Sequence, residues 1–313
     1  MESRSTAYGY LLVAISSIGF GTLGLWGKWG YQAGFTPESL LVLRFGIASI
    51  SLWAVLLLKQ RRFPWPGKRA AVAFIFQGAV FYALTALCFF EALSLLPAGL
   101  ASMLFYLHPV MTTILAGWLW HERISRPQIL ALAVAFVGTA LLAGEAFSGQ
   151  LSLLGVLLTL MGAAAYSGFT LVGQSTGHLA KPLVACTYST TACFLSLLLW
   201  ARPSLSWLAS LSWKQWLIGF GVAQAATVIG ILFFLSGVAI IGASRTAIIA
   251  ALEPASAVVF SALLLGEQMT ANQLLGVVAI LGSICILFVL GRAGQEQSTS
   301  QAITAKPDKN VTG

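Results

Sequence analysis

Long apolar runs constrain this sequence more than any other feature. A helix needs about 20 mainly apolar residues to cross the hydrocarbon core of a bilayer. Charged residues make up 8% of the chain, against about 25% in soluble domains, which excludes a soluble enzyme, a disordered protein and a disulfide scaffold. The sequence predicts an all-α membrane protein with ten transmembrane helices, at Tyr8–Trp26, Leu40–Leu58, Ala70–Leu93, Ala98–Trp120, Gln128–Gly144, Leu151–Val172, Pro182–Trp200, Trp216–Gly237, Ala243–Leu265 and Gln273–Leu290.

The basic residues between these runs predict the orientation in the membrane. Lys and Arg collect in cytoplasmic loops, and placing the N-terminus inside gives twelve basic residues inside against three outside (Lys28, Arg202 and Lys214). Both termini are therefore expected in the cytoplasm, and the bacterial inner membrane is the expected location. The twelve are Arg4, Lys59, Arg61, Arg62, Lys68, Arg69, Arg123, Arg126, Lys181, Arg292, Lys306 and Lys309.

The two halves of the chain resemble each other. An offset of 145 residues places Pro109 on Pro254 and Glu122 on Glu267, so that in each half a proline precedes a glutamate by thirteen residues. Five helices per half is an odd number, so the halves would have opposite orientations in the membrane. Inverted repeats of this kind are typical of transporters whose substrate site lies between the repeats. The predicted organisation is a cytoplasmic N-terminus (1–7), two five-helix repeats (8–144 and 151–290) and a disordered cytoplasmic tail (291–313).

The residues around these prolines carry a family resemblance. The second half has Glu253-Pro254 followed by Leu263-Leu264-Leu265-Gly266-Glu267, and the first half has His108-Pro109 followed by Trp118-Leu119-Trp120-His121-Glu122. In this pattern the chain resembles the ten-helix drug/metabolite transporters with EamA domains, over about Tyr8 to Leu290. The resemblance implies a central cavity lined mainly by helices 1, 3, 4, 6, 8 and 9, and export of small metabolites such as amino acids.

His108 and Glu253 are the first candidates for a substrate-binding or proton-coupling role. They correspond under the 145-residue offset, and an ionisable group in the middle of a membrane span is a functional candidate by default. Pro109 and Pro254 follow them, and a proline inside a helix frees a backbone carbonyl one turn earlier. A polar substrate or a proton could bind there. The alternative is a buried polar group satisfied by neighbouring hydroxyls or backbone.

Other polar residues are secondary candidates for a role in transport. Glu122 and Glu267, at the far ends of their helices, are predicted to have structural or gating roles. Arg44 is expected to extend to the outer interface and pair with Glu38, with direct recognition of an anion as the alternative. Trp26 fits an aromatic belt at the interface or, alternatively, a cavity wall. Further candidates for the cavity lining share helix faces by spacing: Tyr82 and Thr85, Ser102 and Tyr106, Gln224 and Thr227, and Tyr166 of the sixth span.

These features predict a secondary transporter of small metabolites, amino acids or related compounds, that works as an exporter by alternating access, with protons as the candidate coupling ion. A lining of Tyr, Phe, His, Gln and Glu would suit a zwitterion with an apolar side chain. The protein is expected as a monomer or homodimer without cofactor, metal or nucleic acid, and no catalytic constellation supports an enzyme. The alternatives are an importer, a carrier of nucleotide sugars or lipid-linked sugars, and a non-transporting intramembrane enzyme or sensor.

Overall fold

The computed structural model describes residues 2–59, 65–96, 101, 104–120, 124–143, 152–203, 205–265 and 269–304. These residues are almost entirely helical, and no strand occurs among them. The first half of the chain contains α1 (Glu2–Gly21), α2 (Leu23–Gln32), α3 (Pro37–Lys59), α4 (Lys68–Phe76), the π-helix η1 (Gln77–Tyr82), α5 (Ala83–Leu95), α7 (His108–Trp120) and α8 (Arg126–Ala143).

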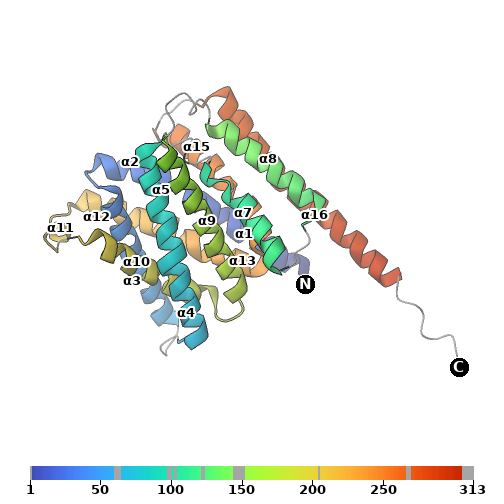
Figure 1. The fold of residues 1–313 in the computed structure, drawn as a ribbon, viewed down its shortest axis with the longest axis horizontal. Helices are drawn as coiled ribbons and strands as arrows, with labels where there is room; N and C mark the ends of the chain where they lie inside the picture. The colour runs from blue at the N-terminus through green and yellow to red at the C-terminus, as the bar shows by residue number, and fades with distance from the viewer. Residues whose placement is uncertain are drawn as a thin grey trace.

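The second half also places a π-helix between two α-helices. It contains α9 (Leu153–Thr176), α10 (Pro182–Ala201), the short α11 (Leu205–Ala209), α12 (Trp213–Val222), the π-helix η2 (Ala223–Ile229), α13 (Gly230–Ile241), α14 (Ala243–Ile249), α15 (Leu252–Leu265) and α16 (Ala271–Thr304). Most of these helices gather in one bundle, and α8 and α16 lie side by side along its edge (Figure 1).

Among the described residues, seven helical segments are long and apolar enough to cross a membrane. They are Thr6–Gln32, Pro37–Lys59, Lys68–Ala92, Leu153–Thr176, Pro182–Ala201, Trp213–Ile241 and Ala243–Leu264. Two further apolar helices, Arg126–Leu142 and Ala271–Leu287, are shorter. The chain is therefore an integral membrane protein.

Local sequence signals explain where several of these helices begin. Pro37 is the first residue of α3 and Pro182 the first of α10, positions where the missing proline N–H would have no helical partner. Ser212 and Gln215 form a capping box at the start of α12, each side chain accepting the backbone N–H of the other residue. These caps place the helix ends in the connections between the apolar runs.

Glycine allows α8 and α16 to approach each other closely. A β-carbon on Gly138 would lie 2.9 Å from the Gly276 carbonyl oxygen, and one on Gly276 would lie 2.7 Å from the Gly138 oxygen. Backbones can come this close only where neither residue has a side chain, which is a common basis of helix packing in membranes. This contact joins the last helices of the two halves.

The last helix is longer than the sequence predicts. The expected span ends at Leu290 and a disordered tail is expected from residue 291, whereas α16 runs to Thr304 and projects beyond the bundle (Figure 1). Extending an existing helix by one residue requires no new nucleation, and the segment from Gln295 to Thr304 contains neither glycine nor proline. Polar composition therefore did not mark the end of the helix.

Candidate functional site

Arg44 lies inside the helix bundle, and its side chain is 4% exposed. Its Nε donates a hydrogen bond to Thr227 Oγ1 at 2.6 Å, and its Nη2 donates to the Tyr82 hydroxyl at 3.4 Å and to the Ala226 carbonyl at 3.5 Å. The prediction that Arg44 reaches the outer interface and pairs with Glu38 is wrong. Hydroxyl groups on other helices hold the guanidinium inward, and helix spacing within α3 could not reveal these partners.

The two hydroxyl partners of Arg44 come from matched places in the two halves. Tyr82 is the last residue of η1 and Thr227 lies in η2, and the 145-residue offset places one on the other. The π-helix, with its wider i→i+5 turn, is rare and is frequently found at functional sites. The structure has one in each half of the chain, and Arg44 contacts both.

The wider turns also change which neighbours some candidate residues meet. Gln224 donates to Ser51 of α3 at 2.7 Å, whereas Thr227 contacts Arg44. Thr85 donates to the Gly162 carbonyl of α9 at 3.3 Å. The structure therefore gives Gln224 and Thr227 different partners, although the sequence predicted that they act on one face.

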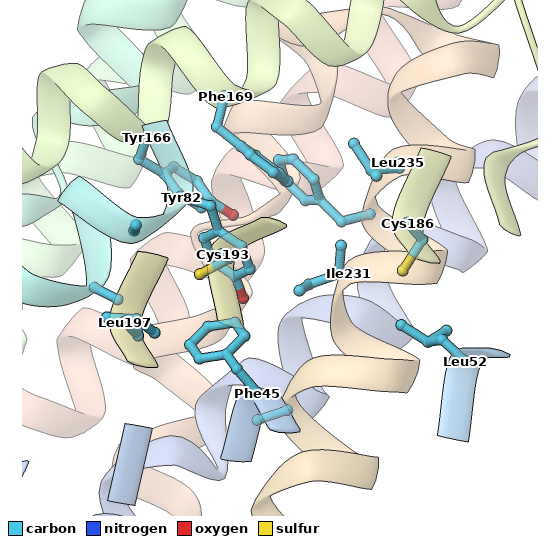
Figure 2. Close-up of a cluster of buried hydrophobic side chains, with 14 of the residues drawn as sticks. Phe45, Leu52, Tyr82, Tyr166, Phe169, Cys186, Cys193, Leu197, Ile231 and Leu235 are labelled. Carbon is cyan, nitrogen blue, oxygen red and sulfur yellow. The ribbon is translucent and has the colours of Figure 1, made fainter. Parts of the chain in front are cut away.

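Aromatic rings lead from Tyr82 to His108. The Tyr82 ring is 4.9 Å from Phe169 between centroids, Tyr166 stacks on Phe169 at 6.1 Å, and His108 meets Tyr166 edge-on at 4.6 Å. Figure 2 shows Tyr82, Tyr166 and Phe169 gathered together, with Phe45 beneath Tyr82. The structure thus brings three predicted site residues from α7, α9 and η1 into one cluster.

Several buried polar atoms in this region have no hydrogen-bond partner. They include both ring nitrogens of His108, which is 1% exposed; the Tyr106 hydroxyl meets no partner at strict hydrogen-bond geometry, but the Glu253 carboxyl group lies beside it. The hydroxyls of Thr112 and Thr113, further along α7, are also unpartnered. Buried polar groups in folded proteins are nearly always hydrogen-bonded, so this concentration within one segment indicates groups that bind something else.

Helix breaks occur at corresponding places in the two halves. In each, a turn interrupts the predicted span, at Tyr106–Leu107 before α7 and at Ala250–Ala251 before α15. Pro109 and Pro254 therefore lie in the first turns of new helices, where their missing N–H costs nothing. The prediction that each lies inside a continuous helix and frees a carbonyl is wrong. Broken helices near the middle of the membrane are typical of transporter substrate sites.

Glu253 lies in the first turn of α15, directly after the second break. Its carboxyl group is within electrostatic reach of the hydroxyls of Tyr82, Tyr106 and Tyr166 and of the Arg44 guanidinium. A helix N-terminus favours a negative charge, which suits this position. Glu253 therefore faces the same tyrosines that surround His108 and Arg44.

The Trp26 side chain is half-buried and packs against α12. Its ring packs where a β-carbon on Gly221 would stand and is 5.3 Å from the Trp29 ring, and its Nε1 is buried without a hydrogen-bond partner. The glycine of α12 leaves room for the indole, and an aromatic-belt position at the membrane interface stays a prediction. A role in the substrate path stays a prediction.

Three predicted residues, Ser102, Glu122 and Glu267, lie outside the described part of the chain. The sequence analysis did not identify Gln77, whose fully buried amide joins η1 to two other helices. Its occurrence inside an apolar run was a signal that could have identified it. Among the described residues, no group of three or more His, Cys, Asp or Glu side chains could hold a metal ion.

The fold and the site together define a membrane transporter, and comparison with known proteins names the family. The profile of the EamA-like transporter family matches the chain twice, over residues 7–144 and 153–289. The chain therefore belongs to the EamA-like transporter family.

Individual relatives agree with this assignment. An uncharacterized transporter of Synechocystis is 30% identical over 63% of this chain and 60% of its own length. The uncharacterized transporter YvbV of Bacillus subtilis is 29% identical over 64% of this chain and 66% of its own length. The matches thus span less than two thirds of these relatives. Another of the same organism, YcbK, is 24% identical over 92% of this chain and 93% of its own length.

A solved structure shares the fold. One crystal structure covers 93% of this chain and 98% of its own chain with a TM-score of 0.73, at 18% sequence identity. Identity this low supports the fold alone.

Proposed function

We propose that this protein is a secondary transporter of small metabolites, amino acids or related compounds, which exports them by alternating access. Ten spans would form two inverted five-helix halves, at 8–144 and 151–290, and both termini would lie in the cytoplasm at a bacterial inner membrane. The two matches of the family profile and the matched π-helices η1 and η2 support this organisation.

The observation that carries the proposal is the group of unpartnered polar atoms beside the first helix break. The His108 nitrogens are buried without partners, and Glu253 lies beside the Tyr106 hydroxyl. A bound polar solute would satisfy these groups, and the surrounding rings would contact its apolar part. Movement of the two halves about this site would expose it to one side of the membrane at a time.

Transport in proteoliposomes tests the proposal. Purified protein is reconstituted, and the uptake and efflux of a panel of labelled amino acids are measured with and without an imposed pH gradient. We expect at least one solute to move, and a proton-coupled transporter would concentrate it when the gradient is imposed. If no solute of a broad panel moves, the proposal fails.

Two variants test the site. His108→Ala and Glu253→Gln should lower transport or change its pH profile. The matched controls, His178→Ala and Glu91→Gln, alter exposed residues and should transport like the wild type. Wild-type transport by both site variants would remove His108 and Glu253 from the mechanism.

A further inference from the structure

Arg44 is a buried cation that forms no ion pair with a described residue, although Glu253 is within electrostatic reach. No Asp or Glu side chain of the described residues lies within ion-pair distance of its guanidinium; its hydrogen bonds go to two hydroxyls and one carbonyl. Burying a charge is costly unless it is paired, and the cost is higher within a membrane.

From this geometry we infer that Arg44 binds the carboxylate of the transported solute. The inference deepens the proposed function and rests on it, because it names the chemical group that the site recognises. A carboxylate would supply the negative charge that the buried guanidinium lacks.

The guanidinium is held in place while part of it stays available. Nε and Nη2 donate to Thr227, Tyr82 and Ala226, whereas Nη1 makes no hydrogen bond with any described residue. Arginine has five N–H donors in a planar fork, and these hydrogen bonds use three of them. These hydrogen bonds fix the orientation of the guanidinium plane and leave the N–H groups of Nη1 available to a ligand.

The surroundings favour a carboxylate with an apolar body. The hydroxyl of Tyr82 accepts a hydrogen bond from Arg44. The Tyr82 ring lies 4.9 Å from the Phe169 ring, and from there the aromatic contacts continue to His108. Apolar groups of the solute would contact these rings while the carboxylate bonds to Arg44. Glu253, within electrostatic reach of Arg44, would lie near the opposite, cationic group of a zwitterion.

The holding residues come from both halves of the chain. Tyr82 and Thr227 occupy matched positions in η1 and η2, and each bonds the same guanidinium. When the halves move relative to each other, this shared contact must change. A carboxylate bound to Arg44 would therefore contact the part of the site that both halves share.

The test compares acids with their amides in the proteoliposomes described above. Labelled L-phenylalanine and L-leucine are transported in competition with L-phenylalaninamide, L-leucinamide and 3-phenylpropionate. We expect the wild type to accept 3-phenylpropionate and to bind the amides about 10-fold to 100-fold more weakly than the acids, because hydrogen bonds to charged groups are the stronger ones. A wild type that transports acids and amides equally would overturn the inference while leaving the proposed function intact.

Substitutions of Arg44 test whether this residue causes the preference for acids over amides. Arg44→Gln should remove most of the preference for acids over amides, and Arg44→Lys should keep part of it, since the charge remains but the fork is lost. Arg202→Gln, at an exposed position, is the control and should discriminate like the wild type. If Arg44→Gln transports with the wild-type preference, Arg44 is structural and the inference is wrong.

Two milder variants keep the test valid if Arg44→Gln does not fold. Tyr82→Phe and Thr227→Val leave the charge in place but release the guanidinium from one hydroxyl each, and both should reduce the preference for acids. The inference would be overturned if Tyr82→Phe and Thr227→Val both kept the wild-type preference for acids over amides and Arg44→Lys kept it as well. Absence of any transport by the wild type would instead refute the proposed function.

Discussion

Replacing Gln77 with leucine should destabilise the protein measurably. The side chain is fully buried in η1; its Nε2 donates to the Phe169 carbonyl of α9 at 2.8 Å, and its Oε1 accepts from Ser189 Oγ of α10 at 3.0 Å. One amide thus joins three helices. Leucine is nearly the same size and would fill the space, so the substitution isolates the loss of the two hydrogen bonds.

The expected magnitude follows from these two bonds. A hydrogen bond contributes about 1 kcal/mol net, and bonds between membrane helices average about 0.6 kcal/mol. The Ser189 hydroxyl would also lose its partner, which costs roughly 1–3 kcal/mol when a group stays buried and unsatisfied. We therefore expect Gln77→Leu to lower the free energy of unfolding by about 2–5 kcal/mol, equivalent to a Tm lower by about 4–20 °C.

The cysteines of the chain provide the assay. Cys88, Cys186 and Cys193 are buried and Cys285 is exposed, so a thiol-reactive fluorophore added to detergent-solubilised protein labels Cys285 first and the other three as the protein unfolds. The melting curve of the second phase gives Tm. Gln32→Leu, at an exposed glutamine, is the control and should melt within about 1 °C of the wild type.

A double variant tests the physical reason. Ser189→Ala removes the donor to Oε1, so adding it to Gln77→Leu should lower Tm by less than it does alone, because the two residues share one hydrogen bond. A Gln77→Leu protein that melts like the wild type would refute the reasoning. Fully additive effects of the two substitutions would show that their hydrogen bond does not couple them.

Glycine contacts give two further predictions, measured with the same melting assay. Gly78→Ala should lower Tm by several degrees, because its β-carbon would meet the Ser189 backbone, with the carbonyl carbon at 2.6 Å; Gly24→Ala, where nothing lies within 4 Å, should leave Tm equal or higher. Gly138→Val should lower Tm by separating α8 from α16 at Gly276, and unchanged melting would show that this contact contributes little to stability.

The apolar runs predicted the main helices well. The expected span Pro182–Trp200 and the observed α10, Pro182–Ala201, differ by one residue at the end, because the length of a membrane helix is set by the bilayer and its start by a proline. The apolar segments of α8 and α16 were predicted as well, and the close approach of Gly138 and Gly276 was not. That contact depends on residues 138 positions apart, which no local pattern relates.

The candidate site was predicted in part. The rarity of ionisable groups in apolar runs identified His108 and Glu253, and the structure connects both to Tyr106 and Tyr166. Helix periodicity failed at Gln224, because a residue count based on 3.6 residues per turn does not hold across a π-helix. Helix periodicity also did not predict that Pro109 lies in the first turn of a new helix, rather than inside a continuous one.

The sequence by itself determined the class of protein: too few charges for a soluble surface, apolar runs of membrane length and recurring rare residues at an offset of 145. Only the tertiary structure decided where Arg44 points. Its position near the start of a span allowed a side chain that reaches the interface, yet its hydroxyl partners lie 38 and 183 residues away, in η1 and η2. Charge and hydropathy act locally along the chain, whereas a buried cation is oriented by whichever polar groups the packed helices bring beside it.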